Sequence, residues 1–512
     1  MSFSSEVLAN VRRSVIGHGS FFDGPFGRKG MIYADWAASG RALTAVENYV
    51  QAEVLPTYAN THTTTSVSGL QSTCFRQEAR QIIAQSCNAR VGYSDRHADV
   101  VVFAGSGTTG AVNKLVLILG IHLPVPSEAP QTSMPVVILG PHEHHSNILP
   151  WRESNAKIVC IPERPDGTID RQILRKELQA HASHSLIIGS FSAASNVTGV
   201  VADVDGITED LHRAGALAFW DYATAASYLQ VDMNPVRFFP DGTLNPYVYK
   251  DAIFLSPHKL PGGPGSPGVL VAKRSLFTNK IPTEPGGGSI FFVTRKDHRY
   301  ISNRCEREEG GTQDIVVGNR THIFLLIRAG LAFQVKNAVG CSIIKKSESD
   351  LCRRIYTSLS QNPNIAVLCS TLRSSCMRMD ALEPPDRLPI ISFLIRCPAD
   401  SKGCSRFLHT SFVCALLNDV FGIQTRGGCA CAGPYALHLL GIDDAKSFAL
   451  EKILLEQTEV MRPGFVRLSL TYFTSRAEVD YTLAALQAVA NHGWRLLPLY
   501  RLDAKSGIWR HK

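Results

Sequence analysis

The sequence predicts an α/β protein in two parts: a large domain built on a mostly parallel sheet, and a smaller α+β domain at the C-terminal end. The first observation is that residues 74–275 alternate short apolar runs with amphipathic stretches, as parallel strands joined by helices do. The second is a long helical pattern at 314–336, after which three further apolar runs follow. The chain has 512 residues, 45% hydrophobic and 19% charged, which is an ordinary globular composition.

Each element follows from its local pattern. In the large domain, strands are expected near Val100, Val136, Ile158, Leu186, Ala216 and Ile253. Strands this apolar should be covered by helices on both faces. In the small domain, strands are expected near Val367, Ile391 and Val466, and a helix at 475–489. We therefore divide the chain into an N-terminal arm with two helices that is part of the small domain (1–54), the large domain (55–313), and the connecting helix with the small C-terminal domain (314–512).

Composition excludes several classes of function. The net charge is +8, but no basic run is long enough to indicate nucleic-acid binding. The longest apolar run, 115–126, is shorter than the about 20 residues that cross a membrane. The 13 cysteines have no regular spacing, which indicates reduced thiols inside the cell. We expect no nucleic-acid partner, no membrane partner and a cytoplasmic location; mitochondrial import through a helix at 5–15 is the alternative.

Lys259 is the first residue with a chemical signature. It follows the apolar run Ala252–Leu255 and precedes a Gly/Pro-rich turn, so its ammonium should be partly desolvated. Desolvation lowers the pKa of a lysine and makes it a better amine nucleophile, as a Schiff-base lysine requires. Ser256 and His258 add two hydrogen-bond donors for a phosphate. The alternative is a surface lysine beside a loop.

Asp221 and a turn of small residues point to the same edge of the sheet. Asp221 ends the apolar run in LAFWD, so it should lie at the carboxyl end of a buried strand, where open α/β sheets bind ligands. Pyridoxal phosphate enzymes pair such a carboxylate with the pyridinium nitrogen; the alternative is a helix N-cap. In AGSGTTGAVNKLV, residues 104–116, backbone amides can approach a phosphate, and Thr108 and Thr109 add hydroxyl donors.

Three histidines lie in PHEHHSN, residues 141–147, after the run MPVVILG. Zinc binding is disfavoured because no acidic or cysteine cluster lies nearby in the sequence, and we expect no metal site. An imidazole stacked on an aromatic cofactor is one interpretation of this motif. Solvent-exposed loop histidines are the other.

These motifs, in this order, resemble the class V aminotransferase family of pyridoxal phosphate enzymes, and within it the cysteine desulfurase and selenocysteine lyase group. The resemblance runs from YADWAASGR at 33–41 to VRLSLTYFTSRAEVD at 466–480, through GTTGAVN, EHHSN, SAASNVTG, SPHK and EGGT. It implies the PLP-dependent transferase fold of type I and pyridoxal 5'-phosphate as cofactor. It also implies a small amino-acid substrate and a homodimer with shared active sites.

The resemblance implies a role for each matching residue. Lys259 would hold the cofactor, Asp221 would pair with the ring nitrogen, and His144 would stack on the ring. Asn196 would bond the ring hydroxyl and reach the substrate, and Arg467 would bind the substrate carboxylate as a bidentate fork. The phosphate would be bound by Thr108, Thr109, Ser256 and His258, while Thr312 would reach the cofactor phosphate of the neighbouring subunit.

Two departures from the family pattern bear on the substrate. Desulfurases usually carry Gln three residues after the strand-end Asp, where this chain has Thr224, and the shorter side chain changes the contact to the ring hydroxyl. The lysine motif reads SPHK instead of the commoner SGHK. Pro257 thereby removes a backbone donor and stiffens the turn.

The loop QTRGGCACAGPY, residues 424–435, distinguishes between reactions. A desulfurase needs a thiolate that attacks the sulfur of a cofactor-bound cysteine, in a mobile, exposed and electropositive setting. Aligning Arg426, Ala432 and Pro434 with the family loop puts Cys431 at the nucleophile position and Cys429 two residues before it. We therefore predict removal of sulfur from L-cysteine to give alanine, through a Cys431 persulfide, with a sulfur-acceptor protein as partner.

Two other functions stay open. The first is a different class V reaction, that of a selenocysteine lyase, an aminotransferase or an epimerase, because fold does not fix function and Cys431 would then be incidental. The second is a non-catalytic interaction module that has kept the fold. The intact set of Lys259, Asp221, His144 and Arg467 argues against it.

Overall fold

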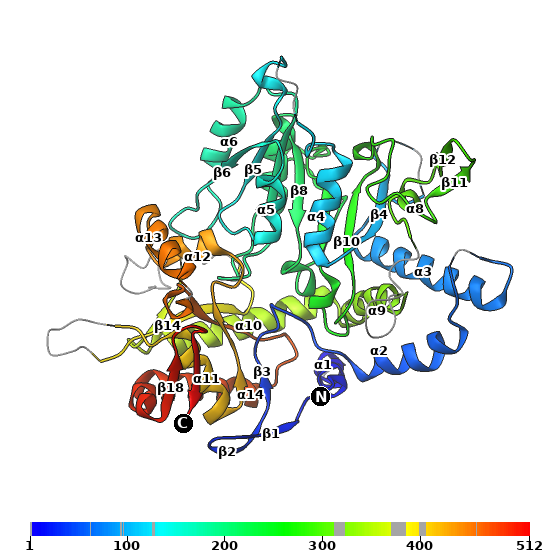
Figure 1. The fold of residues 1–512 in the computed structure, drawn as a ribbon. Coiled ribbons are helices and arrows are strands. Elements are labelled where there is room, and N and C mark those ends of the chain that lie inside the picture. Colours follow the sequence, from blue (N-terminus) through cyan, green and yellow to red (C-terminus); the bar gives the residue numbers. More distant parts are fainter. Residues whose placement is uncertain are drawn as a thin grey trace.

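Two sheets organise the molecule, a seven-stranded sheet in the large domain and a four-stranded sheet in the small domain (Figure 1). The computed structural model describes residues 3–61, 63–92, 95, 97–124, 128–311, 323–369, 386–398, 406–456 and 458–512. The large sheet is mostly parallel and the small one antiparallel, so the predicted α/β fold class is confirmed.

The large sheet has the strand order β4-β10-β9-β8-β7-β5-β6. Its strands are β4 (Asp99–Ala104), β5 (Val136–Leu139), β6 (Lys157–Cys160), β7 (Ile187–Ser192), β8 (Leu217–Asp221), β9 (Ala252–Leu255) and β10 (Gly268–Lys273). All six strands expected from the apolar runs are present. The seventh, β10, pairs antiparallel with both β4 and β9. The alternation does not reveal it, because its run follows directly on the Gly/Pro-rich turn after Lys259.

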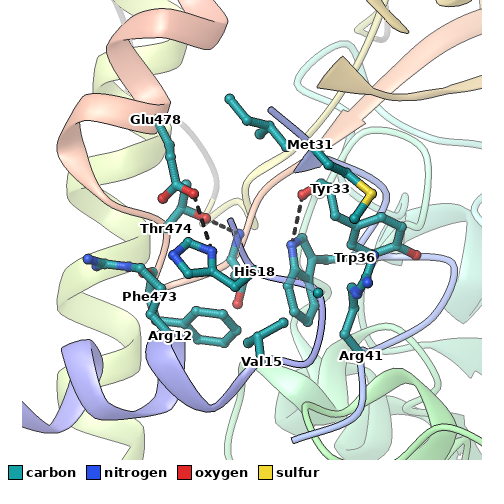
Figure 2. A pocket seen from close by; sticks show the side chains of 13 residues that line it. Arg12, Val15, His18, Met31, Tyr33, Trp36, Arg41, Phe473, Thr474 and Glu478 are labelled. Atoms are coloured by element: carbon teal, nitrogen blue, oxygen red, sulfur yellow. Dashed lines mark hydrogen bonds and ion pairs between the residues drawn. The ribbon is translucent and has the colours of Figure 1, made fainter. Parts of the chain in front are cut away.

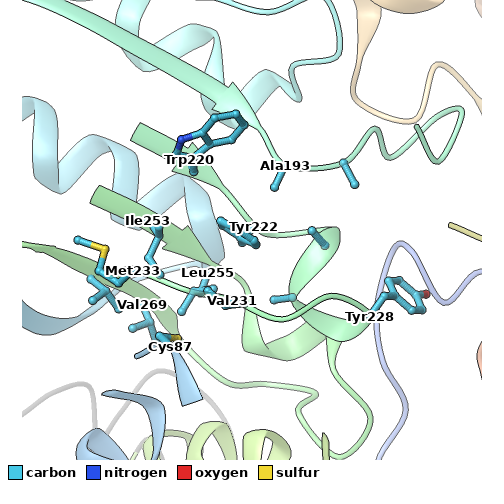
Figure 3. Close-up of a cluster of buried hydrophobic side chains, with 14 of the residues drawn as sticks. Cys87, Ala193, Trp220, Tyr222, Tyr228, Val231, Met233, Ile253, Leu255 and Val269 are labelled. Carbon is cyan, nitrogen blue, oxygen red and sulfur yellow. The ribbon is translucent and has the colours of Figure 1, made fainter. Parts of the chain in front are cut away.

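Helices cover both faces of this sheet. Successive strand residues point to opposite faces, so Val101 packs on one side of β4 and Val102 on the other. One face is covered by α3 (Val67–Ser86), α6 (Arg171–Ala180), α7 (Val204–Arg213) and α9 (Ile323–Val339), and the other by α4 (Gly107–Ile118) and α5 (Leu149–Arg152). Figure 3 shows part of the first face, where Trp220, Ile253 and Val269 bring β8, β9 and β10 into one buried cluster.

The small domain is built on the antiparallel sheet β13-β14-β17-β16. Its strands are β13 (Ile365–Val367), β14 (Ile390–Ile395), β17 (Phe465–Ser469) and β16 (Arg426–Gly428), and its helices are α10 (Cys341–Ser360), α11 (Thr410–Phe421), α12 (Gly433–Leu439), α13 (Asp444–Leu455) and α14 (Arg476–His492). The three strands expected here and the helix from 475 are present. Strand β16 has no apolar pattern, and only its pairing with β17 makes the residues before Cys429 extended.

The N-terminal arm contacts both parts of the molecule: one of its strands pairs with the small domain, whereas Val15, Leu43 and Val46 pack in the core of the large domain. Its elements are α1 (Phe3–Ser14), the hairpin β1–β2 (Phe21–Gly24 and Gly27–Gly30), β3 (Ile32–Tyr33), α2 (Thr44–Tyr49) and its continuation η1 (Val50–Val54). Strand β3 pairs in parallel with β15 (Ile423–Gln424), which lies just before the cysteine loop. The domain boundaries themselves stay a prediction.

Several remaining elements lie outside both sheets. They are η2 (Leu55–Thr57), η3 (Gln131–Ser133), η7 (Arg274–Leu276), β11 (Ile290–Val293), β12 (His298–Tyr300), α8 (Arg304–Arg307), η8 (Glu459–Met461), η9 (Gly493–Leu499), β18 (Tyr500–Asp503) and β19 (Ile508–His511). The C-terminal residues form a hairpin, β18–β19. None of the described helices is both long and apolar enough to span a bilayer.

Candidate active site

A cavity of about 180 Å³ lies at the carboxyl ends of the parallel strands. Open α/β sheets bind ligands at this edge, because the loops after several strands converge there. The N-terminal arm contributes Ala37 and Ala38, and the small domain contributes Arg426, Ala430 and Arg467. The large domain contributes Ser106, Gly107, Thr108, Thr109, His144, Ser146, Asn196, Asp221, Ala223, Ser256, His258 and Lys259. Most of the residues predicted to bind cofactor or substrate thus meet in one cavity.

Three predicted residues are not among those that line it. Cys431 follows the lining residue Ala430 and is half-buried. Thr224 is buried at the N-cap of η5 (Ala225–Ser227), one residue beyond the lining residue Ala223. Thr312 lies outside the described residues.

Lys259 and Asp221 form the ionic centre of the cavity. Lys259 ends the short helix η6 (Pro257–Lys259), which follows β9 directly. Burial lowers the pKa of Lys259 to about 8, against the opposing effect of the Asp221 carboxylate. At pH 7 about one tenth of this amine is therefore neutral and nucleophilic, far more than for an ordinary surface lysine with a pKa of about 10.4.

The Asp221 carboxylate is fixed by two donors. The backbone N–H of Ala223 donates to its Oδ1 at 2.7 Å, and the Thr108 hydroxyl donates to the same atom at 3.3 Å. Burial raises the pKa of Asp221, and the Ala223 hydrogen bond and the Lys259 charge oppose the rise. Asp221 is not a helix N-cap, because Thr224 takes that position in the helix that follows.

The N-terminus of α4 forms a cradle for an anion. Gly107 has a φ of +58°, and a Cβ on it would lie 2.8 Å from Cε1 of His258 and 2.9 Å from Oγ of Ser256. Only glycine allows this approach. The N–H of Thr108 donates to Ser256 Oγ at 2.9 Å, and Thr109 Oγ1 lies 2.6 Å from Ser146 Oγ. Backbone amides, hydroxyls and the helix dipole therefore converge, as phosphate binding requires.

The three histidines of 141–147 have three different environments. Burial, with the Lys259 charge, lowers the pKa of His144 to about 3, so its ring is neutral, and Ser146 N–H donates to its Nδ1 at 3.1 Å. The ring of His142 points instead to Glu163, with 3.4 Å between Nε2 and Oε2. His145 contacts the cysteine loop. Among the described residues, no group of three or more His, Cys, Asp or Glu could hold a metal.

The Asn196 side chain connects the two domains through its Nδ2 atom, and its Oδ1 atom faces no donor among the described residues. Its Nδ2 donates to the carbonyl oxygen of Ala430 at 2.8 Å. Its Oδ1 is buried and has no hydrogen-bond partner among the described residues. A buried carbonyl oxygen without a donor is costly, so this atom is suited to accept a hydrogen bond from a bound molecule.

Arg467 is held by a residue that the sequence did not single out. Its Nη2 donates to Oδ1 of Asp35 at 2.5 Å and its Nη1 to the carbonyl oxygen of Asn196 at 3.1 Å. Its Nε is buried without a partner in the described part of the chain. The signal that could have revealed Asp35 is its place in YADWAASGR, where it is the only acidic residue.

Tyr33 and Trp36, which flank Asp35 in the sequence, line a second and smaller cavity (Figure 2). Trp36 donates from Nε1 to the carbonyl oxygen of Tyr33 at 3.0 Å and meets Phe473 edge to face, with ring centroids 5.1 Å apart. The cavity shown there has a volume of about 40 Å³, which accommodates a few water molecules at most. This cavity is too small for a cofactor.

The cysteine loop forms a tight turn at the edge of the large cavity. Ala432 N–H donates to the Cys429 carbonyl oxygen at 3.1 Å, and the two central residues, Ala430 and Cys431, have φ values of 52° and 58°. This left-handed conformation is unfavourable for residues with a side chain. Arg426 donates from Nη2 to the Sγ atom of Cys431 at 3.4 Å.

Hydrogen bonds from the large domain hold this turn. Besides the Asn196 contact to Ala430, the N–H of His145 donates to the Cys431 carbonyl oxygen at 2.8 Å, and Gly433 N–H donates to His145 Nε2 at 2.9 Å. The loop expected to be mobile and exposed is therefore half-buried and anchored. The reason is tertiary, because all three contacts join residues more than 200 positions apart.

The cavity fits pyridoxal phosphate. It offers an amine of lowered pKa and a fixed carboxylate, at Lys259 and Asp221, for the aldehyde and the ring nitrogen. The cradle at Gly107 suits the phosphate, and the unpartnered Oδ1 of Asn196 suits the ring hydroxyl. Each group has the charge or hydrogen-bonding capacity that its counterpart requires.

The sequence is similar to a known enzyme family and to proteins named cysteine desulfurase. Residues 32–381 match the family model of aminotransferase class-V. A probable cysteine desulfurase of Halalkalibacterium halodurans is 26% identical over 408 residues, 79% of this chain and 84% of that protein. A cysteine desulfurase of Serratia proteamaculans is 25% identical over 463 residues, 90% of this chain and 93% of that protein.

Solved structures agree in fold. The apo cysteine desulfurase of Thermococcus onnurineus NA1 aligns with a TM-score of 0.67 at 21% identity, over 90% of this chain and 95% of that one. The Escherichia coli cysteine desulfurase CsdA, with an S-sulfonic acid, aligns with a TM-score of 0.66 at 21% identity, over 94% and 98%. These alignments confirm the predicted type I fold. Because the family model matches more than half of the sequence, the chain belongs to the aminotransferase class-V family of pyridoxal-phosphate-dependent enzymes.

Proposed function

We propose that this protein is a cysteine desulfurase, which removes sulfur from L-cysteine to give alanine and carries the sulfur as a persulfide on Cys431. The observation that supports this most directly is the Cys431 thiol, held beside the Arg426 guanidinium at the edge of the cavity that contains Lys259. The relatives named cysteine desulfurase support the same reaction.

The proposed binding steps use groups already in place. The Arg467 guanidinium, oriented by Asp35, binds the substrate carboxylate through its remaining N–H donors. Bound pyridoxal phosphate supplies an electron sink for negative charge on the substrate carbon. Asp221 would keep the ring nitrogen protonated, and the neutral His144 ring would pack against the cofactor. Lys259 would move the proton at the substrate α-carbon.

The proposed sulfur transfer is a displacement at the substrate sulfur atom. The Cys431 thiolate forms a bond to that sulfur, the carbon–sulfur bond breaks, and its electron pair stays on the substrate carbon, which takes up a proton. The products are alanine and a Cys431 persulfide. The Arg426 guanidinium stabilises the attacking thiolate.

Further parts of the proposal concern binding and assembly. Thr108, Thr109, Ser256 and His258 would bind the cofactor phosphate, and burial lowers the pKa of His258 to about 4, so it would donate as a neutral ring. Thr224 would adjust the contact to the ring hydroxyl indirectly, because it stands behind the lining. We also propose a homodimer in which Thr312 reaches the phosphate of the neighbouring subunit's cofactor.

Two features would place the enzyme in its cellular setting. We propose a cytoplasmic location, which is supported by the eleven described cysteines, all of them free thiols. A sulfur-acceptor protein would remove the persulfide sulfur from Cys431.

Sedimentation of the cofactor-loaded protein tests the proposed homodimer, and a fully active monomer would contradict it.

The decisive experiment compares the roles of Cys431 and Cys429 in sulfur release. The protein is loaded with pyridoxal phosphate and given L-cysteine or L-selenocysteine, and alanine, sulfide and selenide are measured. Cys431→Ala should abolish sulfur release from cysteine and spare selenide release, because the weaker carbon–selenium bond needs less help from a thiolate. Cys429→Ala is the matched control and should be mild.

Mass spectrometry completes the test. During turnover with cysteine, the peptide that carries Cys431 should gain one sulfur atom. If Cys431→Ala leaves activity on both substrates unchanged, the desulfurase proposal fails and another class V reaction becomes the better account.

A further inference from the structure

His145 connects the cysteine turn to the histidine that faces the cavity. It begins the short helix η4 (His145–Asn147), directly after His144, whose ring lines the cavity. Through its N–H and its Nε2 it contacts Cys431 and Gly433, which lie on either side of Ala432. One short rigid segment therefore carries both the cavity-lining ring and the anchor of the thiol.

The anchor opposes an unfavourable backbone conformation. The left-handed conformation of Ala430 and Cys431 is unfavourable for residues that carry a side chain. Three hydrogen bonds that join Asn196 and His145 to residues 430, 431 and 433 oppose this cost. The conformation of the turn therefore depends on its hydrogen bonds to the large domain. Losing one of these bonds should let the backbone of the turn adopt other conformations.

The His145 imidazole accepts a hydrogen bond only in its neutral form. Gly433 N–H donates to Nε2, so the ring proton must be on Nδ1. Burial, with a smaller effect of the Arg152 charge, lowers the pKa of His145, which favours that neutral form. The approach is also close, because a Cβ on residue 433 would lie 3.0 Å from Nε2.

We propose that His145 is the positioning residue for the Cys431 thiol: it clamps the turn at residues 429–432 so that the sulfur atom stays beside Arg426 at the cavity edge. This rests on the proposed desulfurase function. His145 itself does not react. Its effect is to reduce the number of turn conformations from which the thiol can meet the substrate sulfur, and misplacement of a reacting group by about 1 Å can cost a hundredfold in rate.

Three variants of the cofactor-loaded enzyme test the clamp. His145→Ala removes the acceptor, and kcat for sulfur release should fall about tenfold, with KM and the visible spectrum of the cofactor unchanged. His145→Gln offers an amide oxygen to Gly433 N–H and should recover most of kcat. His438→Ala is the control, because this exposed histidine lies on the same helix α12 as Gly433 but bonds Glu163 instead.

A second readout does not depend on turnover. Alkylation of Cys431 by iodoacetamide, measured peptide by peptide with Cys429 as the internal reference, should be several-fold faster in His145→Ala than in the unaltered protein. It should return toward the original rate in His145→Gln. Thermal melting shows whether the variants are folded, and equal kcat and equal alkylation in His145→Ala and the unaltered protein would overturn the proposal.

The two proposals can fail separately. If Cys431→Ala retains sulfur release, the desulfurase function is wrong, while the alkylation rates still report whether His145 holds the turn. If Cys431→Ala is inactive and His145→Gln is as impaired as His145→Ala, the clamp is wrong and the function stands.

Discussion

Arg467 and Asp35 form a buried pair between residues 432 positions apart in the chain, with Nη2 and Oδ1 separated by 2.5 Å. Arg467 is 1% exposed, so its charge depends on this carboxylate for compensation. Asp35 belongs to the N-terminal arm and Arg467 to strand β17 of the small domain. The arm therefore orients the residue proposed to bind the substrate carboxylate.

Asp35→Asn should weaken substrate binding more than the chemical step. The amide keeps an oxygen for Nη2 but removes the negative charge, so the guanidinium can turn away from the substrate. We expect KM for the amino acid to rise about tenfold and the free energy of unfolding to fall by about 1–3 kcal/mol. Steady-state kinetics and urea titration measure the two effects. Asp23→Asn, at an exposed position of β1, should change neither, and an unchanged KM in Asp35→Asn would contradict the role.

Asp221→Asn should keep the cofactor and lose activity. The amide oxygen can still accept from Ala223 and Thr108, so the site stays formed. The uncharged amide can no longer stabilise the protonated form of the cofactor ring nitrogen. We therefore expect kcat to fall at least about a hundredfold. Visible absorbance gives cofactor content, and alanine formation gives the rate. Near-normal turnover with full cofactor content would remove the proposed role of Asp221.

Cofactor uptake should follow the titration of Lys259. Only the neutral amine reacts, and its fraction rises with pH through the lowered pKa of about 8. The rate of attachment to cofactor-free protein should therefore increase up to that pH and then level off, whereas an ordinary lysine would keep accelerating toward about pH 10. Stopped-flow absorbance at a series of pH values measures this.

The Asp221→Asn variant tests whether the Asp221 carboxylate affects the pKa of Lys259. The Asp221 carboxylate raises the pKa of Lys259, so its removal in Asp221→Asn should move the midpoint to lower pH. A midpoint that stays in place, or one that moves upward, is inconsistent with the two groups being coupled. Lys259→Ala provides the blank, since it should form no covalent bond with the cofactor.

Gly107→Ala should impair phosphate binding. The added methyl group would meet His258 at 2.8 Å and Ser256 at 2.9 Å, so the anion cradle would have to open. We expect the cofactor Kd to rise about tenfold or more. Gly120→Ala is the matched control, because Gly120 has a similar φ of +69° with nothing within 4 Å of its Cβ position. A cofactor Kd in Gly107→Ala no higher than that in Gly120→Ala would contradict the role of the cradle.

Part of this protein could be predicted because the signals are local. Each of two functional residues is marked by one continuous stretch of sequence: strand β8 ends in Asp221, and strand β9 is followed four residues later by Lys259. The same holds for the turn at Gly107 that begins α4. In a mostly parallel sheet the carboxyl ends of such strands meet, so their order along the chain was enough to predict one shared site.

Other parts were decided by tertiary structure alone. Strand β16 is extended because of its pairing with β17, and no local pattern marks it. The Arg467–Asp35 pair and the clamp of His145 on Gly433 join segments 432 and 288 positions apart. A single sequence carries the residue types of such pairs but not their proximity. That proximity depends on how the arm and the small domain pack against the large sheet, which is a balance of many contacts rather than a local preference.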